Sequence, residues 1–108
     1  MSTTAMDVTD ETFQAEVLDC MVPVLVDFWA PWCAPCRAMG PVVDRLAEES
    51  GDSLRVVKIN TEEASGTAMR YAVTSIPRFL LIKNSEVVET IIGQRPYEDL
   101  QATVAQHL

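Results

Sequence analysis

The spacing of apolar residues along this chain predicts its secondary structure. Apolar runs at strand spacing predict four strands, at 24–29, 54–59, 78–83 and 87–92. Helical spacing predicts four helices: a short one that begins after Thr9-Asp10-Glu11, a long one over roughly 34–49, a weaker one over 61–71 and a terminal one that begins at Pro96. A further short strand is expected near 6–8.

The order of these elements predicts an α/β fold. The strand at 24–29 is apolar on both faces, which is typical of a central strand covered by helices on both sides. With the long helix and the strand at 54–59 it forms a βαβ unit, whose strands are parallel neighbours. The two last strands, separated by three residues, form an antiparallel hairpin. We therefore predict a central mixed sheet of four to five strands, flanked by helices on both faces.

Length and composition predict one globular domain over residues 1–108. Of the 108 residues 48% are hydrophobic and 22% are charged, which is enough for one core and no more. The net charge of −8 disfavours binding to nucleic acid or to an anionic membrane. The first ten residues lack the basic and apolar segments of a secretory signal, and no apolar run is long enough to span a membrane. A cytoplasmic location is expected.

Two cysteines lie where the central strand meets the long helix. A helix N-terminus has free backbone N–H groups and a positive dipole end, and both stabilise a thiolate at Cys33. Cys36 returns to nearly the same face one turn deeper, so the pair can close a disulfide while only Cys33 meets solvent. Pro35 fits the first helical turn and stiffens the ring between the sulfurs. This arrangement predicts thiol–disulfide exchange, in which Cys33 attacks and Cys36 resolves the mixed disulfide.

Asp27 is a carboxyl group in the otherwise apolar central strand, on the same face as Leu25 and Trp29. Burial would raise its pKa towards neutrality, where it can take up or return the proton of Cys36. Lys58, on the neighbouring strand, could modulate it. Considered without the cysteines, Asp27 could equally be a structural carboxylate.

The cysteine pair has two alternative uses. A structural zinc site needs four ligands, and the chain offers only Cys20 and His107 besides the pair, so no metal is expected. A structural disulfide across so short a spacing would add little constraint to the unfolded chain. We expect Cys20 to be an incidental thiol and His107 to be a solvated residue.

The segment VDFWAPWCAPC, residues 26–36, resembles the thioredoxin family, in particular its bacterial and chloroplast m-type members. The resemblance covers almost the whole chain and includes Pro41, the run 57–60, Tyr71, the pair Ile76-Pro77 and Gly93. It implies a thioredoxin fold and a monomeric protein-disulfide reductase that needs no cofactor. The implied partners are proteins with disulfides and a thioredoxin reductase that depends on NADPH or ferredoxin. The implied location is the cytoplasm, or the chloroplast stroma if a transit peptide is missing.

The same resemblance implies roles for individual residues. For the chemistry it implies that Cys33 is the nucleophile and Cys36 the resolving thiol. It also implies that Asp27 is a buried acid/base and that Lys58 is its charged neighbour. For substrate binding it implies that Trp32 borders a groove in which Pro77 is a cis-proline. The cis bond would leave the backbone of Ile76 free to pair with an extended substrate strand, and Gly93 would lie in the same groove.

Several positions depart from the family pattern, among them Arg37, which replaces a frequent Lys and keeps its charge. Ala34 stands where Gly is usual, between Cys33 and Pro35, and is expected to shift the redox potential. Arg78 stands where Thr is common, and could alter substrate choice or help to stabilise the Cys33 thiolate. The hairpin has Asn84-Ser85 where Asn-Gly is common, so its turn is less favourable.

Two other functions remain as alternatives. A disulfide oxidase or isomerase could share this fold, although such proteins tend to carry His between the cysteines and to be exported. A redox-independent binding module could use the surface around Trp32, Ile76 and Pro77 to hold a partner.

Overall fold

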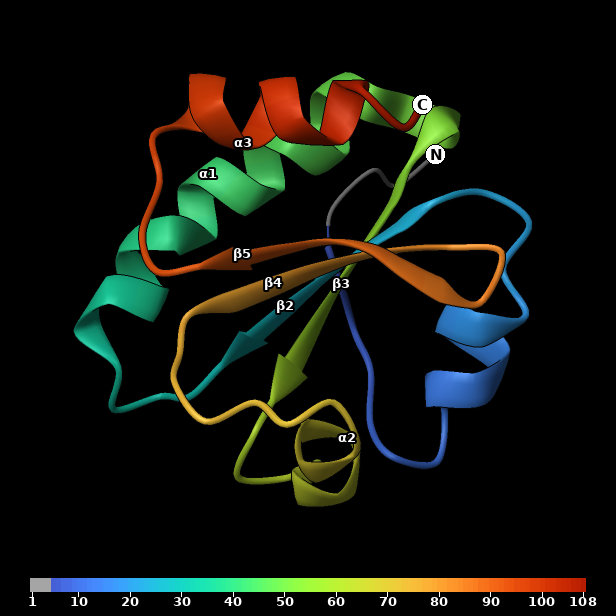
Figure 1. The fold of residues 1–108 in the computed structure, drawn as a ribbon. Helices are drawn as coiled ribbons and strands as arrows, with labels where there is room; N and C mark the ends of the chain where they lie inside the picture. The colour runs from blue at the N-terminus through green and yellow to red at the C-terminus, as the bar shows by residue number, and fades with distance from the viewer. Residues whose placement is uncertain (1–4) are drawn as a thin grey trace.

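A mixed five-stranded sheet forms the centre of the computed structural model, which describes residues 5–108 (Figure 1). Its strands are β1 (Met6–Asp7), β2 (Val24–Trp29), β3 (Arg55–Asn60), β4 (Arg78–Lys83) and β5 (Glu86–Ile92). They are arranged in the order β1-β3-β2-β4-β5. The pairs β1/β3 and β2/β3 are parallel, and the pairs β2/β4 and β4/β5 are antiparallel. The predicted mixed sheet is confirmed, and β2 lies at its centre as expected.

Helices cover both faces of the sheet. The long helix α1 (Ala34–Ser50), followed by a single 3-10 turn (Gly51–Ser53), and the terminal helix α3 (Tyr97–Ala105) lie above the sheet in Figure 1. The short helix α2 (Ser65–Arg70) lies below it. A short π-helix, η1 (Gln14–Leu18), packs into the same core cluster as α2.

The alternation of side chains along β2 divides the core into two clusters. Val24, Val26 and Phe28 point towards η1 and α2 and belong to the first cluster. Leu25 points to the other face and packs in a second cluster that includes Met39 of α1 and residues of α3. Because successive side chains on a strand point to opposite faces, a strand that is apolar throughout needs cover on both sides. Asp27 shares the second face with Leu25.

Helix α2 is shorter than the helix predicted over 61–71. The backbone N–H and the hydroxyl of Thr61 both donate to the carbonyl oxygen of Trp29, at 2.9 and 3.2 Å. The N–H groups of Glu63 and Ala64 donate to the carbonyl oxygen of Asn60, at 3.0 and 2.9 Å. Residues 61–64 therefore form a turn that is attached to the end of β2, and the helix begins only after it.

The helix predicted after Thr9-Asp10-Glu11 also differs. Residues Thr9 to Thr12 form a turn, and η1 follows it without a side-chain cap. The carboxylate of Asp10 instead accepts hydrogen bonds from the start of α2: from the N–H of Gly66 at 3.2 Å, and from the N–H and the hydroxyl of Thr67 at 2.8 and 2.6 Å. Asp10 therefore caps a helix more than fifty residues further along the chain.

The β4–β5 hairpin has the backbone that its unusual turn requires. Asn84 and Ser85 have φ angles of +54° and +67°, values that favour glycine at such positions. The hydroxyl of Ser85 donates to the carbonyl oxygen of Leu18 at 2.8 Å. This hydrogen bond attaches the hairpin to η1, a contact that a glycine at 85 would lack.

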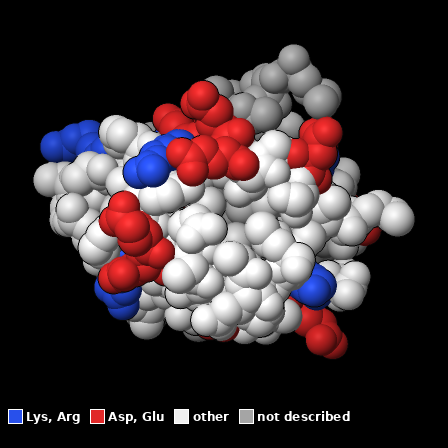
Figure 2. Space-filling model, turned by 90° about the horizontal axis from the view of Figure 1, so that it is seen from above, with Lys and Arg blue, Asp and Glu red and all other residues white. Residues whose placement is uncertain are grey.

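On the outer face formed by α1 and α3, acidic side chains lie in several separate groups, and basic side chains lie beside most of these groups (Figure 2). Among residues 5–108, no helix has both the length and the apolar character that crossing a bilayer would require.

Candidate active site

Several loops meet at one end of the sheet, on the left of Figure 1. Antiparallel pairing places Phe28, near the end of β2, opposite Arg78, the first residue of β4. Arg78 is in turn opposite Ile92, the last residue of β5. The segment that carries the cysteines, the Ile76-Pro77 pair and Gly93 each adjoin these paired residues. The topology therefore gathers segments that are far apart in the sequence.

Cys33 and Cys36 form a disulfide at the N-terminus of α1, with their Cα atoms 5.2 Å apart. Cys33 is the N-cap of the helix, and its Sγ accepts a hydrogen bond from the backbone N–H of Cys36 at 3.2 Å. Ala34 and Pro35 occupy the first helical positions and are exposed. The N–H directed at Cys33 Sγ and the positive end of the helix dipole both favour a thiolate there once the disulfide is reduced.

The two cysteines are almost equally covered in this oxidised form, with exposed fractions of 5% for Cys33 and 4% for Cys36. The expectation that only Cys33 meets solvent is therefore not met at the level of whole residues. Because the disulfide bonds the two sulfurs to each other, Cys33 is hardly more accessible than Cys36 in this form.

Asp27 lies in β2 with 1% of its surface exposed, and neither carboxylate oxygen has a hydrogen-bond partner among residues 5–108. Burial raises the pKa of this carboxyl from 3.8 to about 7, because an apolar environment disfavours the charged form. The positive charge of Lys58 opposes the shift, and the negative charge of Asp44 adds to it. The predicted burial of this carboxyl group is confirmed.

Lys58 is directly opposite Asp27 in the parallel pairing of β2 with β3. Its Nζ lies 4.0 Å from the position that a Cβ would take on Gly40 of α1. Gly40 is one helical turn beyond Cys36, so the two residues lie on the same side of α1. The amine therefore reaches the helix just beyond the disulfide.

Trp32 is 65% exposed and is held in place by Glu62. The indole Nε1–H donates to Glu62 Oε2 at 2.8 Å. Arg37 steadies the same loop, because its Nη1 donates to the carbonyl oxygen of Pro31 at 2.7 Å. Neither partner was among the predicted site residues. Parallel pairing of β2 and β3 was the available signal for Glu62, because the segments that follow parallel strands emerge at the same edge of the sheet.

The Ile76–Pro77 peptide bond is cis, as the family resemblance implied. Pro77 is buried, and its carbonyl oxygen accepts a hydrogen bond from the N–H of Gly93 at 2.9 Å. Gly93 has a φ of +90°, a conformation that other residues rarely adopt. Pro77 and Gly93 are therefore neighbours beside the start of β4.

Arg78 does not extend freely into solvent. Only 9% of it is exposed. Its Nη1 donates to the carbonyl oxygen of Ala72 at 3.4 Å, and its Nη2 donates to Ser75 Oγ at 3.3 Å. The guanidinium is thus directed at the loop that follows α2.

The two residues considered as additional zinc ligands lie elsewhere. Cys20 is half-buried and free, and it lines a surface pocket of about 420 Å³ with Met21 and Arg55. His107 is not simply solvated, since its Nε2 lies 3.0 Å from Glu89 Oε1.

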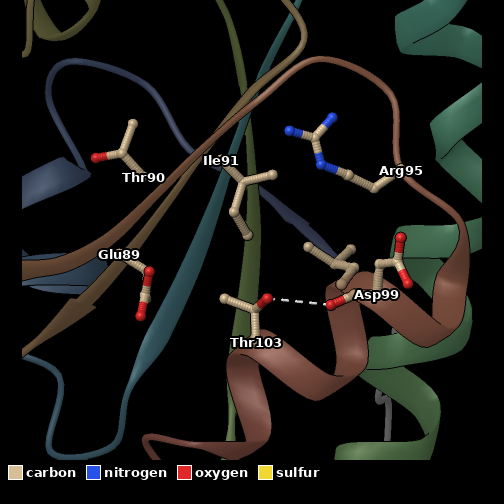
Figure 3. A pocket seen from close by; sticks show the side chains of 7 residues that line it. Glu89, Thr90, Ile91, Arg95, Asp99 and Thr103 are labelled. Atoms are coloured by element: carbon tan, nitrogen blue, oxygen red, sulfur yellow. Dashed lines mark hydrogen bonds between the residues drawn. The ribbon is translucent and has the colours of Figure 1, made fainter.

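A second pocket, of about 230 Å³, lies between β5 and α3 (Figure 3). It is lined by Glu89, Thr90, Ile91, Arg95, Asp99, Leu100 and Thr103. None of these is a predicted site residue. The predicted site is instead the surface around the disulfide.

Comparison with known proteins agrees with this geometry. The sequence model of the family described as thioredoxin matches residues 4–106. The chain belongs to the thioredoxin family. It is 47% identical over 104 residues to thioredoxin 1 of Synechococcus elongatus, an alignment that covers 96% of this chain and 97% of the relative. It is 49% identical over 100 residues to a thioredoxin of Bacillus subtilis, covering 93% of this chain and 94% of the relative.

A chloroplast relative is equally similar. The M-type thioredoxin of Chlamydomonas reinhardtii is 48% identical over 101 residues, which cover 94% of this chain and 72% of the relative. Membership in the thioredoxin family, together with the Cys33–Cys36 disulfide at the helix N-terminus, makes this chain a thiol–disulfide oxidoreductase that reduces disulfides in other proteins.

Proposed function

We propose that Cys33 is the attacking thiolate and Cys36 the resolving thiol of this reductase. Cys33 attacks one sulfur of a substrate disulfide, forms a mixed disulfide and releases the other substrate sulfur as a thiolate. Cys36 then attacks Cys33 Sγ, which closes the Cys33–Cys36 disulfide and releases the second substrate sulfur. Two electrons and two protons pass to the substrate. The observation that carries this proposal is the disulfide at the N-terminus of α1, with the Cys36 N–H directed at Cys33 Sγ.

Asp27 is the group that takes the proton of Cys36 in this proposal. A base acts best when its pKa is close to the working pH, and burial raises the pKa of Asp27 to about 7. Lys58 acts on this transfer from the opposite strand by favouring the charged carboxylate. Ala34 and Pro35 influence the redox potential through the conformation of the first turn of α1.

The substrate binds on the surface formed by Trp32, Ile76, Pro77 and Gly93. Trp32 offers an exposed aromatic ring next to Cys33. Ile76 precedes the cis bond, and its backbone can pair with an extended segment of the substrate. Gly93 permits close approach of the substrate backbone, because it has no side chain.

We further propose that the chain acts as a monomeric single domain without a bound cofactor, in the cytoplasm or the chloroplast stroma. A reductase that depends on NADPH or ferredoxin would return the disulfide to the dithiol. The support is similarity to bacterial, cyanobacterial and chloroplast thioredoxins over nearly the whole chain.

Reduction of insulin by dithiothreitol tests the proposal. The wild type should accelerate the reaction, Cys33→Ser should abolish the acceleration, and Cys36→Ser should accumulate a mixed disulfide visible by mass spectrometry. An inactive wild type would overturn the assignment. A biological activity that survives replacement of both cysteines would instead indicate a binding module, and a strongly oxidising equilibrium with glutathione would indicate an oxidase.

A further inference from the structure

We propose that Arg78 is a positioning residue that holds the loop 72–77 in the conformation that receives the substrate. This inference rests on the proposed function, since it concerns how the Ile76 backbone is presented. The loop connects α2 to β4 and carries the cis-proline (Figure 1).

The loop has few hydrogen bonds of its own. At its start, the N–H of Ala72 donates to the carbonyl oxygen of Met69, and the N–H of Val73 donates to that of Ala68. Within the described residues, no backbone–backbone hydrogen bond involves Thr74, Ser75 or Ile76. Left alone, such a segment would sample several conformations, and a substrate would have to order it on binding.

Arg78 supplies the missing attachment. Its Nη1 and Nη2 donate to the carbonyl oxygen of Ala72 and to Ser75 Oγ, one acceptor at each end of the segment 72–75. The guanidinium has donors in a planar fork, so one side chain can bridge two acceptors. Both hydrogen bonds are long, at 3.4 and 3.3 Å, and each by itself is weak.

The other end of the side chain is fixed. Arg78 is the first residue of β4 and is paired with Phe28 on one side and Ile92 on the other. The loop is therefore attached to the sheet through a residue that cannot move independently of it. The same pairing places this anchor directly after Pro77.

The burial of Arg78 is otherwise unexplained. An arginine that is only 9% exposed usually has a carboxylate partner, because removing a charge from water is unfavourable. Within residues 5–108 none of the three ion pairs includes Arg78, and its Nε is buried without a partner. Among the residues that the structure describes, only the neutral acceptors of the loop compensate for this burial.

If Arg78 positions the loop, its replacement should impair the reduction of protein disulfides but not that of small disulfides. A protein disulfide needs the ordered Ile76 backbone, whereas a small aromatic disulfide such as 5,5′-dithiobis(2-nitrobenzoate) needs only the cysteines. Arg78→Met keeps the length of the side chain and removes its donors. It should raise KM for insulin about fivefold, the effect of losing one or two weak hydrogen bonds, and leave kcat unchanged. The rate with the small disulfide should stay within about twofold of the wild type.

Two further variants should raise KM for insulin by less than Arg78→Met does. Arg78→Lys retains a charge with a single donor head and should give an intermediate KM. Ser75→Ala removes one acceptor from an exposed position and should raise KM about twofold. Lys83→Met, an exposed cation at the other end of β4, is the matched control and should change neither constant.

Amide hydrogen exchange gives a readout that does not depend on activity. The N–H groups of Ala72 and Val73 are hydrogen-bonded at the start of the loop, so their exchange reports on its opening. Their exchange should be faster in Arg78→Met than in the wild type, and unchanged in Lys83→Met. Unchanged exchange and an unchanged KM in Arg78→Met would overturn the positioning role, as would an equal loss of rate with both substrates. A wild type that fails to reduce insulin would overturn the proposed function instead, and the exchange rates would still decide the role of Arg78.

Discussion

Asp27 shows how a single residue acquires a property that its type does not predict. In water its carboxyl would be ionised at neutral pH, but in β2 both oxygens are buried and have no hydrogen-bond partner in the described part of the chain. With a pKa of about 7 it remains largely protonated at mildly acidic pH in the folded protein, whereas the unfolded chain releases the proton near pH 3.8. Stability and reactivity therefore depend on the same proton.

Replacing Asp27 by Asn should make the protein more stable at pH 8. The folded pKa is raised, so the proton contributes stability fully below about pH 4, and this contribution is lost as the pH rises through 7. Between pH 4 and pH 8 the free energy of unfolding of the wild type should decrease relative to that of the variant by on the order of 4 kcal/mol. Urea unfolding of the oxidised proteins at both pH values measures this difference. Asp52→Asn, at an exposed position, is the control and should show no such trend. A difference between wild type and Asp27→Asn that does not change with pH would contradict this account.

Ala72 offers a second prediction about a single residue. It follows the last residues of α2 with a φ of +54°, and the N–H of Val73 closes the turn on the carbonyl oxygen of Ala68. This position favours glycine. Ala72→Gly should raise the free energy of unfolding by about 0.5–1 kcal/mol, whereas Ala102→Gly, exposed inside α3, should lower it by about 1 kcal/mol. Denaturant unfolding of both variants checks this, and destabilisation by Ala72→Gly would refute the argument.

Residue types and their places in the predicted elements were sufficient to single out Cys33, Cys36 and Asp27 as candidate site residues, because a cysteine pair at a helix start and a lone carboxyl in an apolar strand are both unusual. They could not show where Arg78 points. A long side chain can reach several neighbours, and only the folded loop determined that Ala72 and Ser75 receive it.

At the scale of elements, α2 depends on a residue far from it in the sequence. With six residues it is too short to be stable alone. Asp10 accepts hydrogen bonds from Gly66 and Thr67, and the hydrogen bond from the Thr67 hydroxyl is the main reason why the pKa of Asp10 is lowered. The N-terminal turn thereby stabilises the helix that leads to the cis-proline loop.

Replacing Asp10 by Ala should lower the melting temperature by a few degrees at pH 7. Because the folded pKa of Asp10 is lowered, its contribution is present above the ordinary value of 3.8 and is lost as the pH falls through the folded value. The difference from the wild type should therefore shrink in strong acid. Calorimetry at pH 7 and in strong acid measures the two melting temperatures, with Glu11→Ala as the adjacent exposed control. Equal effects of Asp10→Ala and Glu11→Ala at pH 7 would contradict the capping role of Asp10.

Strands and helices whose first and last residues are marked by their own pattern of apolar and polar residues were predicted well. The limits of β2 and β4 agree with the predicted ones, and α1 differs by one residue. The limits of α2 and the nature of η1 were not predicted, because Thr61 is attached to Trp29 and Asp10 is directed at Thr67. Such distant partners leave no periodic signal in the segment itself.

At the scale of the whole molecule, the sheet separates two clusters of buried side chains. Ile59 belongs to the cluster with η1 and α2, and Leu100 to the cluster with α1 and α3. The two residues are fully buried and do not share a cluster. The faces should therefore respond to substitution independently.

Ile59→Val should cost about 1 kcal/mol and Leu100→Ala about 2–4 kcal/mol of unfolding free energy. In the double variant the two losses should add to within about 0.5 kcal/mol, because no neighbour is shared. Phe79→Leu combined with Leu100→Ala, both in one cluster, is the contrasting pair and should depart from additivity. Urea unfolding of the single and double variants measures these free energies. A coupling energy above about 1 kcal/mol between Ile59 and Leu100 would show that the two faces of the sheet are not independent.

The sequence by itself determined the α/β class, the central place of β2, the position of the cysteine pair at a helix start and the unusual carboxyl at Asp27. These follow from periodicity and residue type, which act over a few neighbouring positions. The tertiary structure alone decided that Asp10 caps α2, that Glu62 holds Trp32, and that Arg78 faces the loop 72–77. Each of these contacts joins a side chain to a partner that only folding brings within reach, so its energy is not encoded in any local pattern.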